Sequence, residues 1–277
     1  MTIVRRAEDR FYVVTGSGFG VRDGGWIRSH MPGDGSVGFR ELTPAISVIN
    51  LCGPDSRAVL EKVAEGAVDN AAFPYMTAAE LRIGYAPVLA LRLTYVGELG
   101  YELHVPSDYA AHLYETLWAA GAEFGIANVG YRAIDSLRME KGYLYWGADI
   151  TPDYSPYEAG LGFCVKLGKG EFLGRDALAQ IKEAGVGQKL CSFTLDTPVQ
   201  VHGGEAILHA GEVLGVATSA TYGHSLGQSI VFGYLPIGVA RPNDSGDDYE
   251  IEVFCERLPA KRHDRPLYDP DRARILA

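Results

Sequence analysis

Hydrophobic and polar residues alternate along two short runs of the chain, at positions 89–93 and 101–105. This period of two is typical of β-strands, in which successive side chains point to opposite faces. Between the runs, Gly97 and Gly100 supply the permissive backbone that a chain reversal needs. The pattern therefore predicts a β-hairpin. The apolar residues that share a face are Leu89, Leu91 and Leu93 in the first run and Tyr101, Leu103 and Val105 in the second.

The turn of this hairpin carries Tyr95 and Glu98, and the sequence allows two interpretations of them. In the first, Glu98 is an ordinary turn carboxylate surrounded by water. In the second, the turn directs Tyr95 and Glu98 into a ligand pocket. The alternation of the flanking strands is the same in both cases.

The residues before the hairpin predict further strands and helices. Residues 2–4 and 11–14 are strand-like runs around a polar turn, so the chain is expected to begin in a sheet. A helix is expected around Trp26. The stretch 47–63 predicts a strand and then a helix that begins at Pro54, because proline suits the first helical position. The expected buried stripe of that helix is Val59, Leu60 and Val63.

Two helices are expected after the hairpin. The first has Ser107 as its N-cap and ends at Gly121. The second lies within residues 130–142 and ends at Gly142. Its expected inward-facing residues are Ala133, Ile134 and Leu137. Arg138, one turn after Ile134, is expected to flank this apolar stripe.

Beyond residue 187 the helical periodicity fades and short β-runs separated by glycine turns dominate. Closely spaced strands of this kind are typical of a β-barrel or a β-sandwich. The runs are KLCSFTL, EAILHAGEVLGVATS, SIVFGYL and YEIEVFC. The sequence therefore predicts an α+β fold whose last part is all-β.

Composition excludes several classes of protein. The chain has 277 residues, of which 47% are hydrophobic and 22% charged, a balance typical of soluble proteins. Its net charge of −10 argues against a nucleic-acid binder. No apolar stretch reaches the roughly 20 residues of a membrane span, and residues 1–20 lack the apolar core of a signal peptide. Four widely spaced cysteines suit a reducing compartment, so a cytoplasmic location is expected.

Aromatic and ionisable residues are concentrated in the middle of the chain, whereas a P-loop and metal-ligand histidine spacing are absent from the sequence. Aromatic rings can stack on a flat heteroaromatic ligand, a carboxylate can accept its paired N–H donors, and arginines can meet an acidic tail. A pterin with a glutamate tail matches this set, and so does a tyrosine-rich surface without a ligand. The residues are Tyr95, Glu98, Tyr131, Arg132, Arg138, Glu140, Tyr143, Tyr145, Trp146, Asp149, Tyr154, Tyr157 and Glu158.

Several long motifs resemble one family. The segments YVGELGYELHVP, YRAIDSLRMEKGYLYWGADI, SPYEAGLGFCVKL and ATSATYGHSLGQSIVFGYLP are similar to the folate-binding family of the glycine-cleavage T-protein, an aminomethyltransferase. The nearest branch resembles the C-terminal folate half of dimethylglycine and sarcosine dehydrogenases, and the ending LPAKRHDRPLYDP is similar to that branch too. The resemblance runs over essentially the whole chain, with the motifs in order.

The resemblance implies a multi-domain cloverleaf around an opening that holds tetrahydrofolate, with a β-barrel as its last domain. Residues 1–180 would then form interleaved α+β folate-binding domains, with an incomplete first lobe, and residues 181–277 the C-terminal barrel. In this family the Tyr-x-Gly-Glu turn contributes a carboxylate to the pterin. The resemblance therefore implies that Glu98, Tyr95 and Tyr143 bind the cofactor.

The chain departs from the family pattern at two places. Where the T-protein helix carries an arginine before its aspartate, this chain has Ile134, so Arg132 is the residue expected to meet the acidic tail of the folate. The strand with the family's catalytic aspartate should immediately precede the first residues of this chain. The resemblance thus implies N-terminal truncation relative to the family and leaves the catalytic residue unknown.

Two functions from different classes follow from the resemblance. The first is tetrahydrofolate-dependent transfer of a one-carbon (aminomethyl) group, which yields 5,10-methylenetetrahydrofolate, within a dimethylglycine- or sarcosine-type demethylating system; a folate-dependent demethylase is a variant. The second is a non-catalytic folate-binding subunit that needs a partner chain. The implied partners are a small methylated or aminomethyl donor and an FAD-dependent dehydrogenase chain or domain. The iron–sulfur-repair relatives are disfavoured because residues 141–149, KGYLYWGAD, contain no cysteine.

Overall fold

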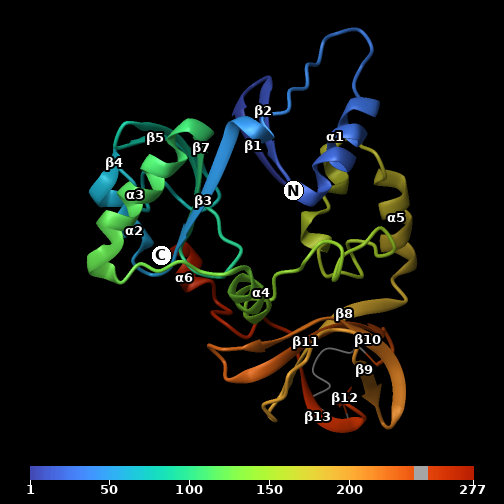
Figure 1. The fold of residues 1–277 in the computed structure, drawn as a ribbon. Helices are drawn as coiled ribbons and strands as arrows, with labels where there is room; N and C mark the ends of the chain where they lie inside the picture. The colour runs from blue at the N-terminus through green and yellow to red at the C-terminus, as the bar shows by residue number, and fades with distance from the viewer. Residues whose placement is uncertain (240–248) are drawn as a thin grey trace. The chain divides into compact units, whose positions relative to one another are not determined.

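The structure is a computed structural model, and it describes residues 1–239 and 249–277. The chain divides into two compact units, whose elements are labelled in Figure 1. Unit 1 consists of Met1–Thr94, Leu99–Ile126 and Leu276–Ala277, and unit 2 consists of Tyr95–Glu98 and Ala127–Ile275. The turn 95–98 is therefore part of unit 2, although the strands on either side of it belong to unit 1.

A five-stranded antiparallel sheet forms the centre of unit 1, with the strand order β3-β7-β6-β5-β4. The predicted hairpin is confirmed, because β6 pairs with β7 and Leu89 lies opposite His104. On β7 the predicted face is confirmed, because Tyr101, Leu103 and Val105 are buried in the core. On β6 the predicted face is wrong: the core contains Val88 and Ala90 from the other face, whereas Leu89 and Leu93 are only partly buried. The hairpin is covered on both faces, so alternation alone does not select the core side of β6. The strands are β3 (Ile46–Cys52), β4 (Ala64–Glu65), β5 (Ala78–Ile83), β6 (Ala86–Leu91) and β7 (Gly100–Pro106).

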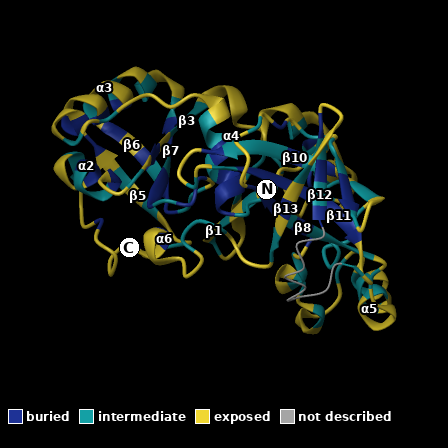
Figure 2. Cartoon of the chain, turned by 90° about the horizontal axis from the view of Figure 1, so that it is seen from below, coloured by how far each residue is buried: buried dark blue, intermediate teal, exposed yellow. Residues whose placement is uncertain are grey.

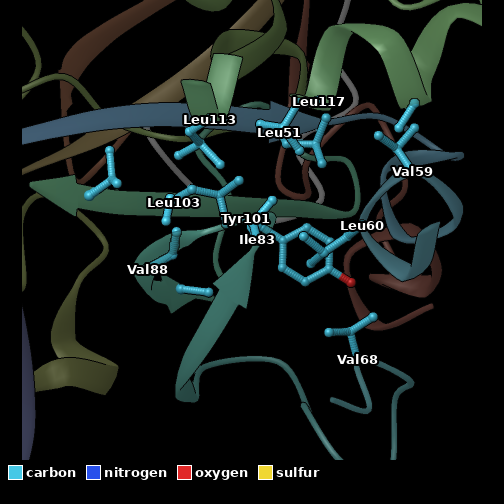
Figure 3. Close-up of a cluster of buried hydrophobic side chains, with 14 of the residues drawn as sticks. Leu51, Val59, Leu60, Val68, Ile83, Val88, Tyr101, Leu103, Leu113 and Leu117 are labelled. Atoms are coloured by element: carbon cyan, nitrogen blue, oxygen red, sulfur yellow. The ribbon is translucent and has the colours of Figure 1, made fainter. Parts of the chain in front are cut away.

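Helices α2 (Ser56–Val63) and α3 (Ala110–Gly121) pack together against this sheet. Figure 3 shows the resulting core, in which helix and strand side chains meet. Val59 and Leu60 are buried in this core and Val63 is partly buried against it, so the predicted stripe of α2 is confirmed. The labelled core residues are Leu51, Val59, Leu60, Val68, Ile83, Val88, Tyr101, Leu103, Leu113 and Leu117.

The starts of these two helices differ from the prediction. Helix α2 begins at Ser56, two residues after Pro54, with Asp55 as its N-cap. Helix α3 is preceded by a 3-10 turn, η3 (Ser107–Tyr109), so the N-cap position falls on Tyr109. The Ser107 hydroxyl therefore caps no helix, and it donates to the carbonyl of Pro44 at 3.3 Å instead.

The first residues of unit 1 form a separate two-stranded antiparallel sheet, as predicted. Strands β1 (Thr2–Ala7) and β2 (Arg10–Val14) pair with Ile3 opposite Val13. The expected helix around Trp26 is α1 (Gly20–Ser29). Short 3-10 turns complete the unit: η1 (Ser17–Phe19), η2 (Thr43–Ala45) and η4 (Ala122–Phe124).

Six strands of unit 2 close into a β-barrel in the order β10-β11-β8-β13-β12-β9, so the all-β ending is confirmed as a barrel. Its interior is apolar, and the barrel strands include many of the buried positions in Figure 2. A Cβ atom at Gly233 would lie 2.3 Å from Ile207 Cδ1 and 2.9 Å from the Val216 carbonyl oxygen, so a glycine is required where these strands approach. The strands are β8 (Gln188–Leu195), β9 (Ala206–His209), β10 (Glu212–Gly223), β11 (Gln228–Pro236), β12 (Tyr249–Val253) and β13 (Glu256–His263).

The rest of unit 2 is helical or irregular. Helix α4 (Tyr131–Glu140) precedes the barrel in sequence, and α5 (Arg175–Ala184), which the sequence analysis did not identify, leads into it. Two 3-10 turns, η5 (Gly162–Cys164) and η6 (Leu167–Lys169), lie between them, and α6 (Ala273–Leu276) follows the barrel. Within the described ranges, no helix combines the length and the apolar character needed to cross a membrane.

Candidate ligand-binding site

Helix α4 buries a charged face, contrary to the prediction from its apolar residues. Ala133, Ile134 and Leu137 are only half-buried. The fully buried residues of the helix are Ser136, Arg138, Met139 and Glu140. Arg138, expected to flank the apolar stripe and not to face water, is indeed shielded from water: only 2% of it is exposed, and it is part of the buried face itself.

The burial of Arg138 is possible because fixed acceptors surround its guanidinium. Its Nη1 atom donates to Asp149 Oδ2 at 2.6 Å and to the Tyr143 carbonyl at 3.1 Å. Its Nε atom donates to Asp135 Oδ1 at 2.7 Å, and its Nη2 atom donates to Ser219 Oγ at 2.9 Å. Burial alone would lower the pKa of Arg138, but the charges of Asp149 and Asp135 raise it above its ordinary value. The side chain is thus held as a cation.

Asp149 is the fully buried partner of this cation and has hydrogen bonds at both carboxylate oxygens. Thr218 donates to Oδ1 at 2.7 Å, and the backbone N–H of Tyr145 donates to Oδ2 at 2.9 Å. The Tyr234 hydroxyl donates to the Asp149 carbonyl at 2.8 Å. This network fixes α4 and the loop after it to strands β10 and β11 of the barrel.

The turn 95–98 lies against the residue that follows α4, and Gly97 makes this close approach possible. Its φ angle is +77°, a conformation that disfavours other residues. A Cβ atom at this position would also lie 2.9 Å from both Cβ and Cγ of Lys141. The glycine of the Tyr-x-Gly-Glu motif is therefore required twice, once by the backbone and once by the neighbouring side chain.

Tyr95 and Tyr143, two of the predicted cofactor-binding residues, are brought together by this turn. Their rings are stacked, with centroids 6.1 Å apart and planes inclined by 14°. The Tyr95 hydroxyl donates to the Leu144 carbonyl at 2.7 Å. Burial raises the pKa of Tyr95 to about 12, so the hydroxyl is neutral and remains a donor at physiological pH. Tyr95 is still 38% exposed, which leaves part of the aromatic pair accessible.

Glu98 is hydrogen-bonded within unit 2 and is not the solvated turn carboxylate of the first interpretation. Only 15% of its side chain is exposed. The Tyr268 hydroxyl donates to Glu98 Oε1, and Arg274 Nη1 lies 3.2 Å from Oε1 and 3.4 Å from Oε2. Burial, together with the hydrogen bond to Glu98, raises the pKa of Tyr268 to about 12. The Glu98 carboxylate is therefore held by two donors from the end of the chain.

Tyr268 and Arg274 are site residues that the sequence reasoning missed. Tyr268 lies in the segment LPAKRHDRPLYDP, whose similarity to the dehydrogenase branch assigns it no role, and Arg274 follows this segment. No periodicity connects either of them to position 98, because they approach it only in the folded unit.

Arg132 is not brought to the other predicted residues by any contact within the described part of the chain. It is exposed on the first turn of α4. The neighbouring Tyr131 forms a hydrogen bond with Tyr145, which raises the pKa of Tyr131. Among the described residues there is no group of three or more His, Cys, Asp or Glu side chains that could hold a metal ion. The side chains that the structure brings together at the turn 95–98 are the rings of Tyr95 and Tyr143 and the hydrogen-bonded carboxylate of Glu98.

The fold places the chain in the class of mixed α/β proteins that contain a closed six-stranded β-barrel. Two family models identify the family within that class. The GCVT N-terminal domain model matches residues 1–169, and the glycine cleavage T-protein C-terminal barrel domain model matches residues 188–269. The chain belongs to the glycine cleavage T-protein family, which confirms the resemblance of its motifs.

Known proteins support the same assignment. Mitochondrial sarcosine dehydrogenase of Homo sapiens is 41% identical over 83% of this chain and 26% of its own length. Mitochondrial dimethylglycine dehydrogenase of Rattus norvegicus is 35% identical over 99% of this chain and 32% of its own length. The chain therefore spans between a quarter and a third of the length of these curated relatives.

A solved structure shows the same fold. Glycine cleavage system aminomethyltransferase T from Bartonella henselae matches with a TM-score of 0.81 and 26% identity. The match covers 97% of this chain and 71% of that one. The predicted fold class, α+β with a C-terminal barrel in a T-protein-like arrangement, is thus confirmed.

Proposed function

We propose that this chain binds tetrahydrofolate and takes part in the transfer of a one-carbon (aminomethyl) group to it. The observation that carries the proposal is the turn 95–98, which stacks Tyr95 on Tyr143 and also carries the hydrogen-bonded carboxylate of Glu98. Membership of the T-protein family supports the choice of ligand. The relatives named as sarcosine and dimethylglycine dehydrogenases support a small N-methylated donor.

The residues present fit a pterin. The aromatic pair offers a flat apolar face for ring stacking. Glu98 Oε2 accepts one hydrogen bond from the described residues, the 3.4 Å bond from Arg274 Nη1. Because a carboxylate oxygen can accept two hydrogen bonds, Oε2 can still accept one from an N–H group of a ligand. Arg132, exposed and without an ion pair in the described ranges, is the proposed contact for the acidic tail of the folate.

Bound at this turn, tetrahydrofolate would supply a nucleophilic nitrogen for a carbon at the oxidation level of formaldehyde, such as an iminium carbon, and the products would be 5,10-methylenetetrahydrofolate and the free amine. No oxidant is needed when the donor already carries an aminomethyl carbon. With a methylated amine as donor, an FAD-dependent dehydrogenase partner supplies the oxidation. The chain contributes binding and orientation, which can account for about 7–11 kcal/mol of the barrier when reactants are well positioned. No residue of the chain is assigned as the catalytic base.

Titration of the full chain with tetrahydrofolate, followed by intrinsic fluorescence and calorimetry, tests the proposal. We expect saturable binding in the micromolar range that is weakened about tenfold or more by Glu98→Ala, since a charge-assisted hydrogen bond contributes about 1.5–3 kcal/mol. Glu115→Ala is the matched control, because Glu115 is an exposed carboxylate on α3 in unit 1. Unsaturable binding by the wild-type chain, or equal affinity of the two variants, would contradict the proposal.

A second candidate is a folate-binding subunit that acts only with a partner chain. The observation that favours it is the apolar surface of the β1–β2 sheet, where Ile3 is 63% and Phe11 56% exposed. Accessible apolar groups of this kind often mark a protein interface. Product formation that requires an added FAD-dependent dehydrogenase, with complex formation weakened by Phe11→Ser, would favour this candidate. Transfer from an aminomethyl donor by the chain alone would favour the first.

A further inference from the structure

The segment that follows the last barrel strand, residues 266–275, is bound both to the end of α4 and to the turn 95–98. We call it the terminal strap. Its hydrogen bonds to Glu98, Glu140 and Lys141 join residues of unit 2. The backbone N–H of Tyr268 donates to the Glu140 carbonyl at 2.9 Å, and the Tyr268 hydroxyl donates to Glu98. One residue of the strap thus connects α4 to the proposed ligand carboxylate.

A buried ion pair anchors the strap next to this residue. Lys141 Nζ donates to the Asp269 carbonyl at 2.6 Å and to Asp269 Oδ2 at 2.8 Å. The two side chains are 3% and 6% exposed. Burial favours the neutral acid, but the hydrogen bond and charge of Lys141 and the N–H groups of Arg274 and Ala273 hold the pKa of Asp269 below its ordinary value. The Asp269 carboxylate is therefore ionised at neutral pH.

The same aspartate fixes the position of Arg274. Asp269 Oδ1 accepts from the backbone N–H of Ala273 at 2.8 Å, and Oδ2 accepts from that of Arg274 at 3.2 Å. Asp269 and Arg272 have φ angles of +46° and +64°, which non-glycine residues rarely adopt. Such backbone persists only where the surroundings over-determine it. The strap is thus held in a specific conformation that presents Arg274 to Glu98.

The donors of the strap are distributed unequally over the Glu98 carboxylate. Oε1 accepts from Tyr268 and lies 3.2 Å from Arg274 Nη1, whereas the described residues make one hydrogen bond to Oε2, from Arg274 Nη1 at 3.4 Å. The Arg274 guanidinium also lies over the Tyr268 ring, 5.1 Å from its centroid, so the two donors support each other. A carboxylate oxygen can accept two hydrogen bonds, so Oε2 is the oxygen available to a ligand.

We propose that Tyr268 and Arg274 are positioning residues that saturate Glu98 Oε1 and present Oε2 to the paired N–H donors of a heteroaromatic ligand. The inference rests on the proposed function, because it concerns the carboxylate that is proposed to bind the pterin. The terminal strap is then part of the site. Selectivity for the pterin ring depends on Tyr268 and Arg274, which are far from Glu98 in sequence.

Binding measurements with two probes test this assignment on the full chain. The probes are tetrahydrofolate, which has the pterin ring, and p-aminobenzoylglutamate, which has only the tail. We expect Tyr268→Phe and Arg274→Gln each to weaken tetrahydrofolate binding about tenfold, or about 1.4 kcal/mol, and to leave binding of the tail probe unchanged. In a Glu98→Gln background, neither substitution should weaken tetrahydrofolate binding further. Arg265→Gln, which removes an exposed ion pair with Asp271 on the same strap, is the matched control.

The outcomes separate this inference from the proposed function. A wild-type chain that binds no tetrahydrofolate would overturn both. Wild-type binding that Tyr268→Phe and Arg274→Gln leave unchanged would overturn the positioning role alone. Equal loss for both probes, or loss that persists in the Glu98→Gln background, would show that the strap acts on general structure, and would also overturn it. Circular dichroism and melting temperatures of each variant identify any that fail to fold.

Discussion

Replacing Arg138 by Met removes the cation at the centre of the buried network while keeping most of its apolar volume. The substitution leaves the fully buried Asp149 carboxylate without its countercharge. Thr218 and the Tyr145 backbone N–H still donate to this carboxylate, so part of its compensation survives. Ser219 loses its donor from the guanidinium as well. The variant thus isolates the electrostatic part of the packing of α4 against the barrel.

The expected loss of stability is large because the pair is buried on both sides. Removing one partner of such a pair typically costs about 3–5 kcal/mol. The two surviving donors place the expected loss at the lower end, about 3 kcal/mol. Asp135→Asn is the matched control: it removes the other carboxylate partner, whose side chain is 46% exposed, and exposed pairs contribute about 0–1 kcal/mol. Removal of the cation should therefore cost about 3 kcal/mol, whereas removal of its exposed partner Asp135 should cost about 0–1 kcal/mol.

Urea unfolding of the full chain, followed by fluorescence and near-UV circular dichroism, measures these losses. Two probes are needed because the two units can unfold separately. Asp149→Asn should be destabilising in the wild-type chain but should recover stability in the Arg138→Met background, since it removes the uncompensated charge. A loss below about 1 kcal/mol for Arg138→Met, or simple additivity of the two substitutions, would refute the reasoning.

Three further predictions concern other parts of unit 2. Gly97→Ala should cost about 1–3 kcal/mol in urea unfolding and weaken tetrahydrofolate binding, because its Cβ would overlap Lys141; unchanged stability would contradict this. Glu140→Gln should be neutral or stabilising in the same assay, since its buried Oε2 has no partner in the described chain, and a loss as large as that of Glu140→Ala would contradict it. Burial, and to a smaller extent the positive charge of Lys261, holds the pKa of His263 below its ordinary value of 6.5. As the pH drops below 6.5, the unfolded chain takes up the proton more readily than the folded chain does, so the melting temperature should fall. His263→Gln should flatten this dependence, and an identical pH profile for the variant would contradict the assignment.

Local patterns were sufficient for the elements whose stability is local. The pairing of β6 with β7 follows from two strand-like runs and two glycines, although alternation gives the buried face correctly only for β7. The C-terminal barrel follows from short, closely spaced strands. In α2, an apolar stripe predicts the buried face because Val59 and Leu60 pack on the sheet without polar partners. In each case, the sequence window that carries the signal also contains the residues that form the element.

Helix α4 shows where local patterns fail. Its apolar residues predict the face with Ile134, yet the buried face carries Arg138 and Glu140. A charged residue is excluded from a core only while it lacks partners, and the partners of Arg138 include Asp149 and Ser219, which are 11 and 81 positions away in sequence. Hydrophobic periodicity contains no information about them. The burial of this helix is therefore decided by tertiary compensation of charge.

In the candidate site, too, some features follow from local sequence and others depend on tertiary contacts. Tyr95 and Tyr143 are brought together, and the motif around Gly97 explains why the turn can approach Lys141. Glu98, by contrast, owes its position to the terminal strap, which begins 168 positions later along the chain, from residue 98 to residue 266. A motif thus identified the carboxylate, whereas the direction in which its free oxygen points depends on donors that no motif near it contains. Because recognition of paired N–H groups requires that direction as well as the charge, the strap is as much a part of the proposed site as the turn.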